Sequence, residues 1–356
     1  LALREEVLFF TTFFDRIEER SVNVINPFKL QDAMLPIASL NQVIVDGQKS
    51  NDRFSPLLIM RALGEITDHY GITPLSHDLQ GLMETLSHHP NHEVHEAFIR
   101  VGEYFGDQLA KLLFTLLNAD DKVKMENLRW KDEHWDYWKT IKSIYLMGGV
   151  ASSAFKPIFM KRINMLFDQH GLDDVQVFMP DDTQDQALYG MANRFDRGSF
   201  LLFDFGQTFI KRAYVRRMSG QNMIERKLEH MPAKHLEPAD SDHFMAHAFE
   251  LHHYILEILK DTIQELMDPD IDLLISMANY VKKGELNPGR SSYGMLSVLS
   301  TNYQDYLEQE LNKHLNRNIH VYLEHDTTAM AHSVPQQPHT AVITLGTAFG
   351  ISFIDE

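Results

Sequence analysis

Two acidic residues in the second half of the chain follow apolar runs, where a carboxylate is well placed for chemistry. Asp204 ends the run FLLF and precedes a Gly-Gln-Thr turn at 206–208, and Lys211 lies in the next apolar run. Asp326 stands where IHVYLEH gives way to a helical pattern. Asp204 can hold hydrated Mg²⁺, because that ion keeps several waters and takes few carboxylates. Asp326 can accept a proton from an attacking hydroxyl, although capping a helix is the commoner role of an isolated Asp.

Two Gly-Thr turns lie between strand-like runs. One contains Gly206 and Thr208, and the other, in ITLGTAFGISF, contains Gly346, Thr347 and Gly350. Successive backbone N–H groups in such a turn can cradle a phosphate, because Gly lets the anion approach closely. Most Gly-Thr pairs are ordinary hairpin turns, so neither turn is decisive alone.

A Gly-Gly turn at Gly148 and Gly149 follows the apolar run IYLM. The missing side chains leave room for an adenine or a ribose, and the start of the next helix favours negative charge. We expect Ser152 or Ser153 to cap that helix. A single Gly-Gly turn is usually structural, so its weight depends on the other motifs.

The composition limits the class of protein. The 356 residues, 44% of them apolar, can fill two or three packed domains. The 33 basic residues against 50 acidic ones give a net charge of -17, which disfavours nucleic acid as a partner. The lack of Cys excludes disulfides and thiolate zinc sites.

The sequence shows neither a membrane-spanning run nor a secretion signal. No apolar run approaches the length of a membrane span, so we expect no membrane partner. The sequence starts at Leu1 with no signal-like segment, so we expect a cytoplasmic protein. The oligomeric state, a homo-oligomer included, is left open.

Clustered histidines invite a metal interpretation, which their spacing does not favour. They are His88, His89, His92 and His95 around a Pro-containing loop, and the adjacent pair His252 and His253. None forms a helical i, i+4 pair with a carboxylate base, so solvated surface is the better interpretation. The chain also lacks the GxxxxGK[ST], GxSxG and GxGxxG motifs.

The first part of the chain, residues 1–118, is predicted to be mostly helical. Apolar residues from Ala97 to Leu116 recur at spacings of three and four, and Gly102 and Gly106 would let that helix approach a neighbour closely. The charge-dense stretch 119–140 carries all three Trp. Its acidic and basic residues balance, so we interpret it as a surface insertion whose Trp side chains pack on the body or on a partner.

The remaining chain alternates strands and helices. Residues 142–195 read as strand, helix, strand, helix. After them come a three-strand meander from 200, a long helix, and then strand, helix, strand and a helix start at 327. The C-terminal hairpin at 341–354 cannot be stable alone. It can supply the meander that 142–195 lacks, so we expect it to pair with the strand at 143–147.

Together these motifs resemble those of the sugar kinases of the actin, Hsp70 and hexokinase superfamily, particularly the ROK type. DFGQTFIK is similar to the first phosphate loop of that family, LEHDTTAMA to the segment carrying the catalytic Asp, and ITLGTAFGISF to the second phosphate loop. IYLMGGVASSAFKPIF, followed by DQALYGMA, is similar to the adenosine segment.

The order of the motifs departs from that family, in which the first phosphate loop comes first and the adenosine segment last. The resemblance therefore implies an α/β protein of two ribonuclease-H-like lobes (the actin-like ATPase fold) around a nucleotide cleft, circularly permuted. One lobe would comprise 198–335 and the other 1–197 with 336–356. A fusion of fragments with accidental matches is the alternative.

The resemblance implies a cytoplasmic kinase of carbohydrate metabolism that uses ATP and Mg²⁺ to phosphorylate a hydroxyl of a sugar or related small molecule. Asp326 would be the catalytic base, and Asp204 would hold Mg²⁺ through water. The phosphates would lie against Asp204, Gly206, Gln207, Thr208, Lys211, Gly346, Thr347 and Gly350, and the adenosine against Gly148, Gly149 and Ser152.

The acceptor is the least defined part of this interpretation. The family often has Asn before its catalytic Asp, where this chain has His325, and its Gly-Glu-x-Gly-His segment and Cys-rich zinc loop do not occur here. Sugar contacts would come instead from Asn279, Asn287, Arg290 and His325. These losses keep a second hypothesis open, a non-catalytic nucleotide- or sugar-binding sensor or assembly protein.

Overall fold

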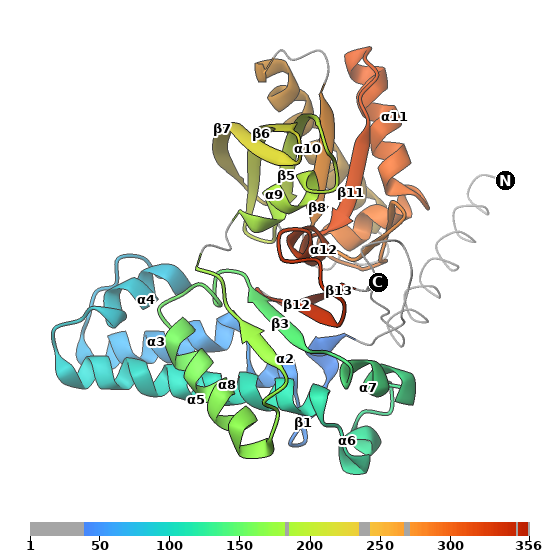
Figure 1. The fold of residues 1–356 in the computed structure, drawn as a ribbon. Coiled ribbons are helices and arrows are strands. Elements are labelled where there is room, and N and C mark those ends of the chain that lie inside the picture. Colours follow the sequence, from blue (N-terminus) through green and yellow to red (C-terminus); the bar gives the residue numbers. More distant parts are fainter. Residues whose placement is uncertain (1–38, 182–184, 235–242, 267–270, 347, 355–356) are drawn as a thin grey trace. The chain divides into compact units, whose positions relative to one another are not determined.

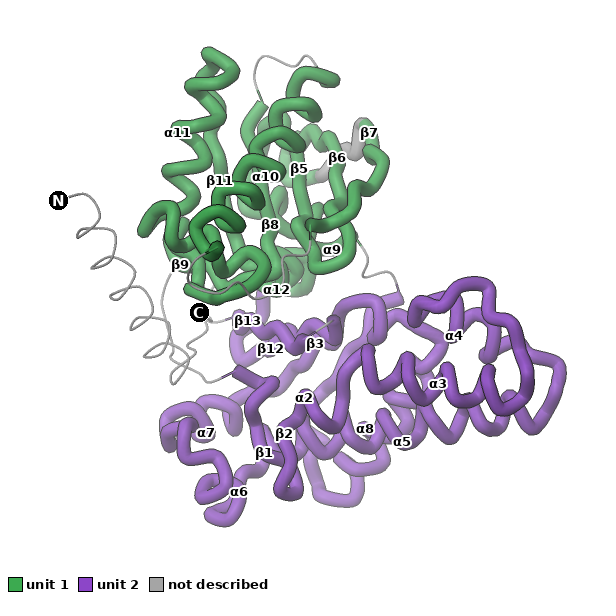
Figure 2. Tube along the Cα trace, turned by 180° about the vertical axis from the view of Figure 1, so that it is seen from behind, with its two compact units in different colours: residues 1–34, 185–335 green, residues 35–184, 336–356 purple. Residues whose placement is uncertain are grey.

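The computed structural model describes residues 39–181, 185–234, 243–266, 271–346 and 348–354 (Figure 1). They form two compact units, one from 185–335 and the other from 35–184 together with 336–356 (Figure 2). The helices, parallel strands and antiparallel hairpins confirm the predicted α/β class.

The first unit is built on a five-stranded mixed sheet in the order β11-β8-β5-β6-β7. Strands β5, β6 and β7 form the predicted antiparallel meander, and β8 and β11 add parallel to β5. Apolar alternation with tight turns produces the meander, and the intervening helices return the chain for the parallel strands. The strands are β5 (Gly198–Phe205), β6 (Phe209–Met218), β7 (Gln221–Pro232), β8 (Asp272–Met277) and β11 (Val321–His325).

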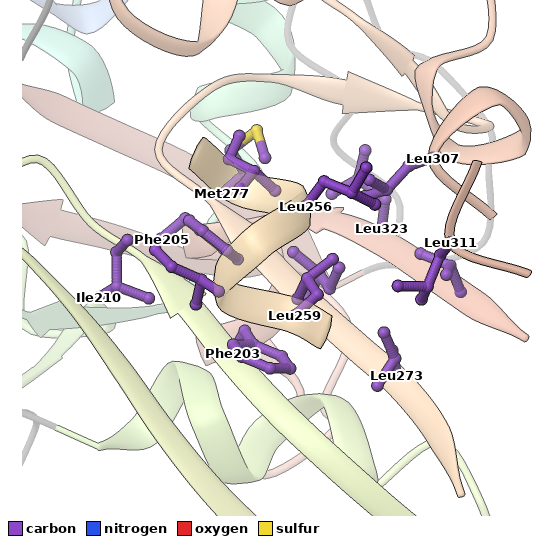
Figure 3. Packing of buried hydrophobic residues seen from close by; sticks show 14 of the residues in the cluster. Phe203, Phe205, Ile210, Leu256, Leu259, Leu273, Met277, Leu307, Leu311 and Leu323 are labelled. Atoms are coloured by element: carbon purple, nitrogen blue, oxygen red, sulfur yellow. The ribbon is translucent and has the colours of Figure 1, made fainter. Parts of the chain in front are cut away.

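One face of this sheet carries a large hydrophobic core. Phe203 and Phe205 of β5 lie beside Leu256 and Leu259 on the helix that crosses them (Figure 3). Because strand side chains alternate between faces, the next residue along, Asp204, points to the opposite face. The covering elements are α10 (Phe244–Leu266), α11 (Tyr303–Leu315), the 3-10 helix η2 (Ser292–Val298) and the hairpin β9 (Val281–Lys282) and β10 (Glu285–Leu286).

Two short helices, α9 (Gln186–Ala192) and α12 (Asp326–Ala331), pack on each other and on the same unit. A Cβ on Gly190 would lie only 1.9 Å from the backbone oxygen of Ala329, so only Gly fits at this crossing. The sequence prediction had placed 185–197 in the other lobe. The helix belongs with 198–335 because its tertiary partner, α12, lies there.

The second unit contains a four-stranded sheet in the order β13-β12-β3-β4. Strand β12 (Thr340–Leu345) pairs parallel with β3 (Ser143–Met147) and antiparallel with β13 (Phe349–Ile354), while β4 (Gln176–Phe178) adds on the far side of β3. The predicted pairing of the C-terminal hairpin with 143–147 is therefore confirmed, in the register Thr340 opposite Ser143.

The second unit also contains helices and a short hairpin. They are α2 (Ser50–Arg53), α3 (Pro56–Tyr70), α4 (Leu79–Ser87), α5 (His92–Leu117), α6 (Asp121–Glu126), α7 (Asp132–Trp138) and α8 (Lys156–His170), with the 3-10 helix η1 (Leu40–Gln42) and the hairpin β1 (Ile44–Val45) and β2 (Gln48–Lys49). The prediction that the three Trp side chains pack on the body is confirmed, since all three are buried. Residues 1–38, predicted to be largely helical, lie outside the described residues.

Helix α8 begins later than predicted. The expected cap was Ser152 or Ser153, but the helix starts at Lys156. Ser152 Oγ donates to the backbone oxygen of Gly148, and Ser153 Oγ donates to that of Val150, so both hydroxyls close turns before the helix. Within the described ranges, no helix has both the length and the apolar character needed to cross a membrane.

The predicted close approach at Gly102 is confirmed and yields a stability test. A Cβ on Gly102 of α5 would lie 2.8 Å from Phe155 and 2.9 Å from Ile158, whereas one on Gly64 of α3 would meet nothing within 4 Å. Gly102→Ala and Gly64→Ala gain the same helix propensity, about 0.5–1 kcal/mol. Only Gly102→Ala overpacks, at a cost of about 1–3 kcal/mol.

We therefore expect urea unfolding of the second unit to show Gly64→Ala at least as stable as the parent. Gly102→Ala should be less stable than Gly64→Ala by about 1–3 kcal/mol. Equal midpoints for the two variants would contradict the tight helix crossing.

Candidate functional site

Three neighbouring strands of the first unit place Asp204, Lys211 and Ser276 together. Asp204 at the end of β5 lies opposite Lys211 of β6 and opposite Ser276 of β8 in the strand register. Lys211 Nζ lies 3.2 Å from Asp204 Oδ2, and Ser276 Oγ donates to Asp204 Oδ1 at 2.8 Å. The side chain of Asp204 is only 6% exposed. The buried carboxylate therefore has a cation on one oxygen and a hydroxyl on the other.

Burial governs the protonation of Asp204. It raises the pKa of this carboxyl above its ordinary value of 3.8, and the charge of Asp326 adds to the rise. The charge of Lys211 and the hydroxyl of Ser276 oppose the rise without cancelling it. Such a carboxyl gains strongly from a cation, because positive charge stabilises its ionised form.

The turn at 206–208 follows Asp204 and is held from two sides. Tyr293 Oη donates to the backbone oxygen of Gly206 at 2.8 Å, and Gln207 Nε2 donates to that of Ala278 at 3.4 Å. Among the described residues, the backbone amides of Gln207 and Thr208 meet no acceptor. Two N–H donors thus remain available in a fixed turn, as an anion-binding loop requires.

Asp326 starts α12 directly after β11 and is 24% exposed. Its Oδ1 receives the backbone amide of Thr327 at 2.6 Å, the hydroxyl of Thr327 at 3.2 Å and His325 Nε2 at 3.0 Å. Burial alone would raise the pKa of Asp326, but His325 and the Thr327 hydrogen bonds lower it below the ordinary value. The carboxylate therefore stays ionised to lower pH than a typical Asp.

Asp204 and Asp326 share one electrostatic environment. Asp326 contributes to the raised pKa of Asp204, and both charges, after burial, contribute to raising the pKa of Tyr293. The ends of β5, β8 and β11 therefore bring together the two carboxylates that the sequence analysis singled out, Asp204 and Asp326. Parallel strands place their carboxyl ends at the same edge of the sheet, which explains the proximity.

The residues proposed for sugar contact have other partners in the structure. Asn279 Nδ2 donates to the backbone oxygen of Asn287, and Asn279 Oδ1 accepts the backbone amide of Asn287, so this pair closes the loop around β9 and β10. Arg290 is exposed in the loop that follows. His325 is buried and directed at Asp326.

In the second unit, the Gly-Gly turn is shaped by the backbone. Gly148 has a φ of +96°, and a Cβ there would lie 3.1 Å from the backbone oxygen of Leu345. Gly149 faces open space, with nothing within 4 Å of a Cβ. The amide and hydroxyl of Ser152 both bond to the backbone oxygen of Gly148. Gly148 and Ser152 thus fix the turn, and the room for a ligand lies at Gly149.

The second Gly-Thr turn is only partly described. Gly346 follows β12, and Thr347 lies outside the described residues. Gly350 lies within β13, where its amide donates to Thr344 Oγ1 at 3.0 Å, so this amide is already engaged. Of the three residues predicted to bind phosphate in this turn, Gly350 is placed in the strand.

Sequence reasoning missed three residues that support these turns. Ser276 and Tyr293 contact Asp204 and Gly206, and Asn41 bonds both the amide and the carbonyl of Phe349 through its side chain, at 2.8 and 3.0 Å. A polar residue inside the apolar run LLISM was the available signal for Ser276. Asn41 lies some three hundred residues from its partner, and no local pattern marks it.

Comparison with known proteins does not identify the chain. No protein-family model matches it, and no curated protein matches it.

The two carboxylates predict opposite pH dependences of unfolding for the first unit. The folded-state pKa of Asp204 is raised, so stability from this group falls as the pH rises above 3.8. The folded-state pKa of Asp326 is lowered, so its stabilisation is present above 3.8 and is lost as the pH falls.

We expect Asp204→Asn to be better tolerated at neutral pH than in acid. Asp326→Asn should cost more stability at neutral pH than in acid. Denaturant-dependent hydrogen exchange of the β5 and β8 amides, followed from acid to neutral pH, measures the stability of both variants in the same unit. The same trend with pH for both would contradict the assignment.

Proposed function

We propose that the chain is an ATP-dependent kinase that transfers a phosphoryl group to a hydroxyl of a sugar or a related small molecule. The observation that carries the proposal is the buried Asp204, paired with Lys211 and Ser276, beside the ionised Asp326 at the ends of β5, β8 and β11. The meander edge with added parallel strands, and the C-terminal hairpin that completes the β3 sheet, support a circularly permuted actin-like ATPase fold.

The chemistry of Asp204 fits a hydrated Mg²⁺. A raised pKa means that the ionised form of this buried carboxyl is not fully stabilised, because the charge of Lys211 offsets only part of the effect of burial. A bound cation would stabilise the ionised form further. Bound Mg²⁺ would neutralise charge on the phosphates of ATP. Lys211 adds a second positive charge, and the amides of Gln207 and Thr208 would donate to phosphate oxygens.

Asp326 would orient the attacking hydroxyl and accept its proton. As the oxygen–phosphorus bond forms and the bond to the leaving ADP oxygen breaks, the hydroxyl proton passes to the carboxylate. The lowered pKa makes Asp326 a weak base. A weak base suffices where phosphoryl transfer has a loose transition state, because orientation and charge neutralisation then supply most of the rate enhancement.

One observation favours a second candidate, a nucleotide-binding sensor without turnover. Three donors already converge on Asp326 Oδ1, and the carboxylate resists protonation. A structural Asp at a helix start would look similar. ADP release from a panel of sugars with ATP and Mg²⁺ separates the two, because a sensor binds nucleotide and releases no ADP in excess of the acceptor-free rate.

Asp326→Asn tests the base directly. Loss of general-base catalysis lowers turnover by about 10²–10⁴-fold, while ATP affinity should stay within a factor of about 3, since the phosphate turn is untouched. Asp305→Asn, an exposed Asp in the first turn of α11, is the matched control and should turn over like the parent. Parent-like turnover by Asp326→Asn would remove the assignment.

The phosphate turn gives an independent test that needs no turnover. Mg·ATP should slow hydrogen exchange at the amides of Gln207 and Thr208, because phosphate oxygens would accept their N–H groups. The Ser219–Gly220 turn between β6 and β7 of the same unit is the control and should not respond. Equal responses at both turns, or none at 206–208, would argue against phosphate binding there.

A further inference from the structure

His325, the last residue of β11, is buried and contacts two side chains. It is 4% exposed, and its ring lies 4.2 Å from the ring of Tyr280 between centroids. Its Nε2 lies 3.0 Å from Asp326 Oδ1. Among the described residues, its buried Nδ1 has no hydrogen-bond partner. An imidazole held in this way cannot turn outward without leaving Tyr280 and Asp326.

The contacts of His325 decide which oxygen of Asp326 remains usable. All three donors to this carboxylate, from His325 and Thr327, converge on Oδ1. No donor among the described residues reaches Oδ2. A carboxylate oxygen has about two lone-pair directions, so three donors saturate Oδ1. The acceptor capacity of Asp326 is therefore concentrated on Oδ2.

The tautomer follows from the same contacts. An ionised carboxylate only accepts hydrogen bonds, so the nitrogen that faces it must carry the proton. In the neutral ring this assigns the proton to Nε2 and leaves Nδ1 as the unprotonated nitrogen. The packing of the Tyr280 ring against the imidazole fixes the orientation of the imidazole plane, and with it the direction of the Nε2–H bond.

We propose that His325 is a positioning residue, which donates Nε2–H to Asp326 Oδ1 so that Oδ2 faces the acceptor hydroxyl. This inference rests on the proposed kinase function. It gives His325 a different role from the sugar contact expected from sequence. Its loss should therefore lower the rate of transfer rather than the affinity for the acceptor.

The kinetic test uses the full chain with the best acceptor of the sugar panel. His325→Leu keeps an apolar body and removes the donor, so we expect kcat to fall about 10–100-fold with both KM values nearly unchanged. His325→Gln, whose amide can still donate toward Asp326, should recover much of that loss. His320→Gln, five residues earlier beside Glu308, is the matched control and should behave like the parent.

The kinetic outcomes are distinct. A raised acceptor KM with unchanged kcat in His325→Leu would show a substrate contact and overturn the proposal. Parent-like kinetics in His325→Leu would overturn it too. Melting temperature and ATP affinity are measured for each variant to detect a folding defect. If His325→Leu is poorly folded, the kcat of His325→Gln tests the proposal instead.

A second measurement is independent of turnover. Long-range ¹H–¹⁵N spectra should show a proton on Nε2 of His325, whose signal is assigned by its loss in His325→Gln. Asp326→Ala should speed exchange of that Nε2 proton. A ring that carries its proton on Nδ1 and none on Nε2 would overturn the positioning role. If no sugar is phosphorylated while the Nε2 tautomer is found, the kinase proposal fails and the orientation of Asp326 by His325 stands.

Discussion

The burial of Asp204 is the constraint on which the first unit depends. Removing a carboxylate from water is costly unless charge and hydrogen bonds compensate, and here both come from adjacent strands. Lys211 and Ser276 reach Asp204 only because β6 and β8 pair with β5 in the observed register. A one-residue slip of β6 would turn Lys211 to the other face and leave the carboxylate without its cation. The site thus specifies the pairing of the sheet as much as the sheet positions the site.

A second charged cluster fixes the helix that carries Asp326. Glu324, next to His325 on β11, pairs with Arg194 and lies 3.2 Å from His332 beyond α12. Burial, with the charge of Arg194, lowers the pKa of His332 to about 3, so this imidazole is neutral and Arg194 balances the charge of Glu324. Asn193 Nδ2 also donates to the backbone oxygen of His332. These contacts, with the close crossing at Gly190, hold the C-terminal part of α12 against α9 and β11.

The sequence predicted the fold best where a local pattern was clear, or where an element needed a partner strand that only one other segment could supply. Alternation and turn residues predicted the meander from 200, and the unpaired C-terminal hairpin predicted its partner strand at 143–147. Local patterns did not show that the Ser153 hydroxyl closes a turn instead of capping a helix. They also did not show on which unit α9 packs. The residue types at Asp204 and Asp326 were visible, but Ser276, Tyr293 and Asn41 acquire their roles only through contacts across strands and loops.

The pKa values of the two carboxylates shift in opposite directions because their surroundings differ, and that difference bears on the proposed reaction. Asp204 is buried and has a raised pKa, which suits a group that holds a cation. Asp326 has a lowered pKa, which makes it a poor base for a proton on carbon. In phosphoryl transfer, the hydroxyl proton leaves late, after the attacking oxygen has begun to bond to phosphorus. The base that accepts it therefore needs little basicity, but it must be well oriented. Fixed donors on one oxygen of Asp326 provide orientation, so this pair of carboxylates fits the proposed phosphoryl transfer better than it would fit proton abstraction from carbon.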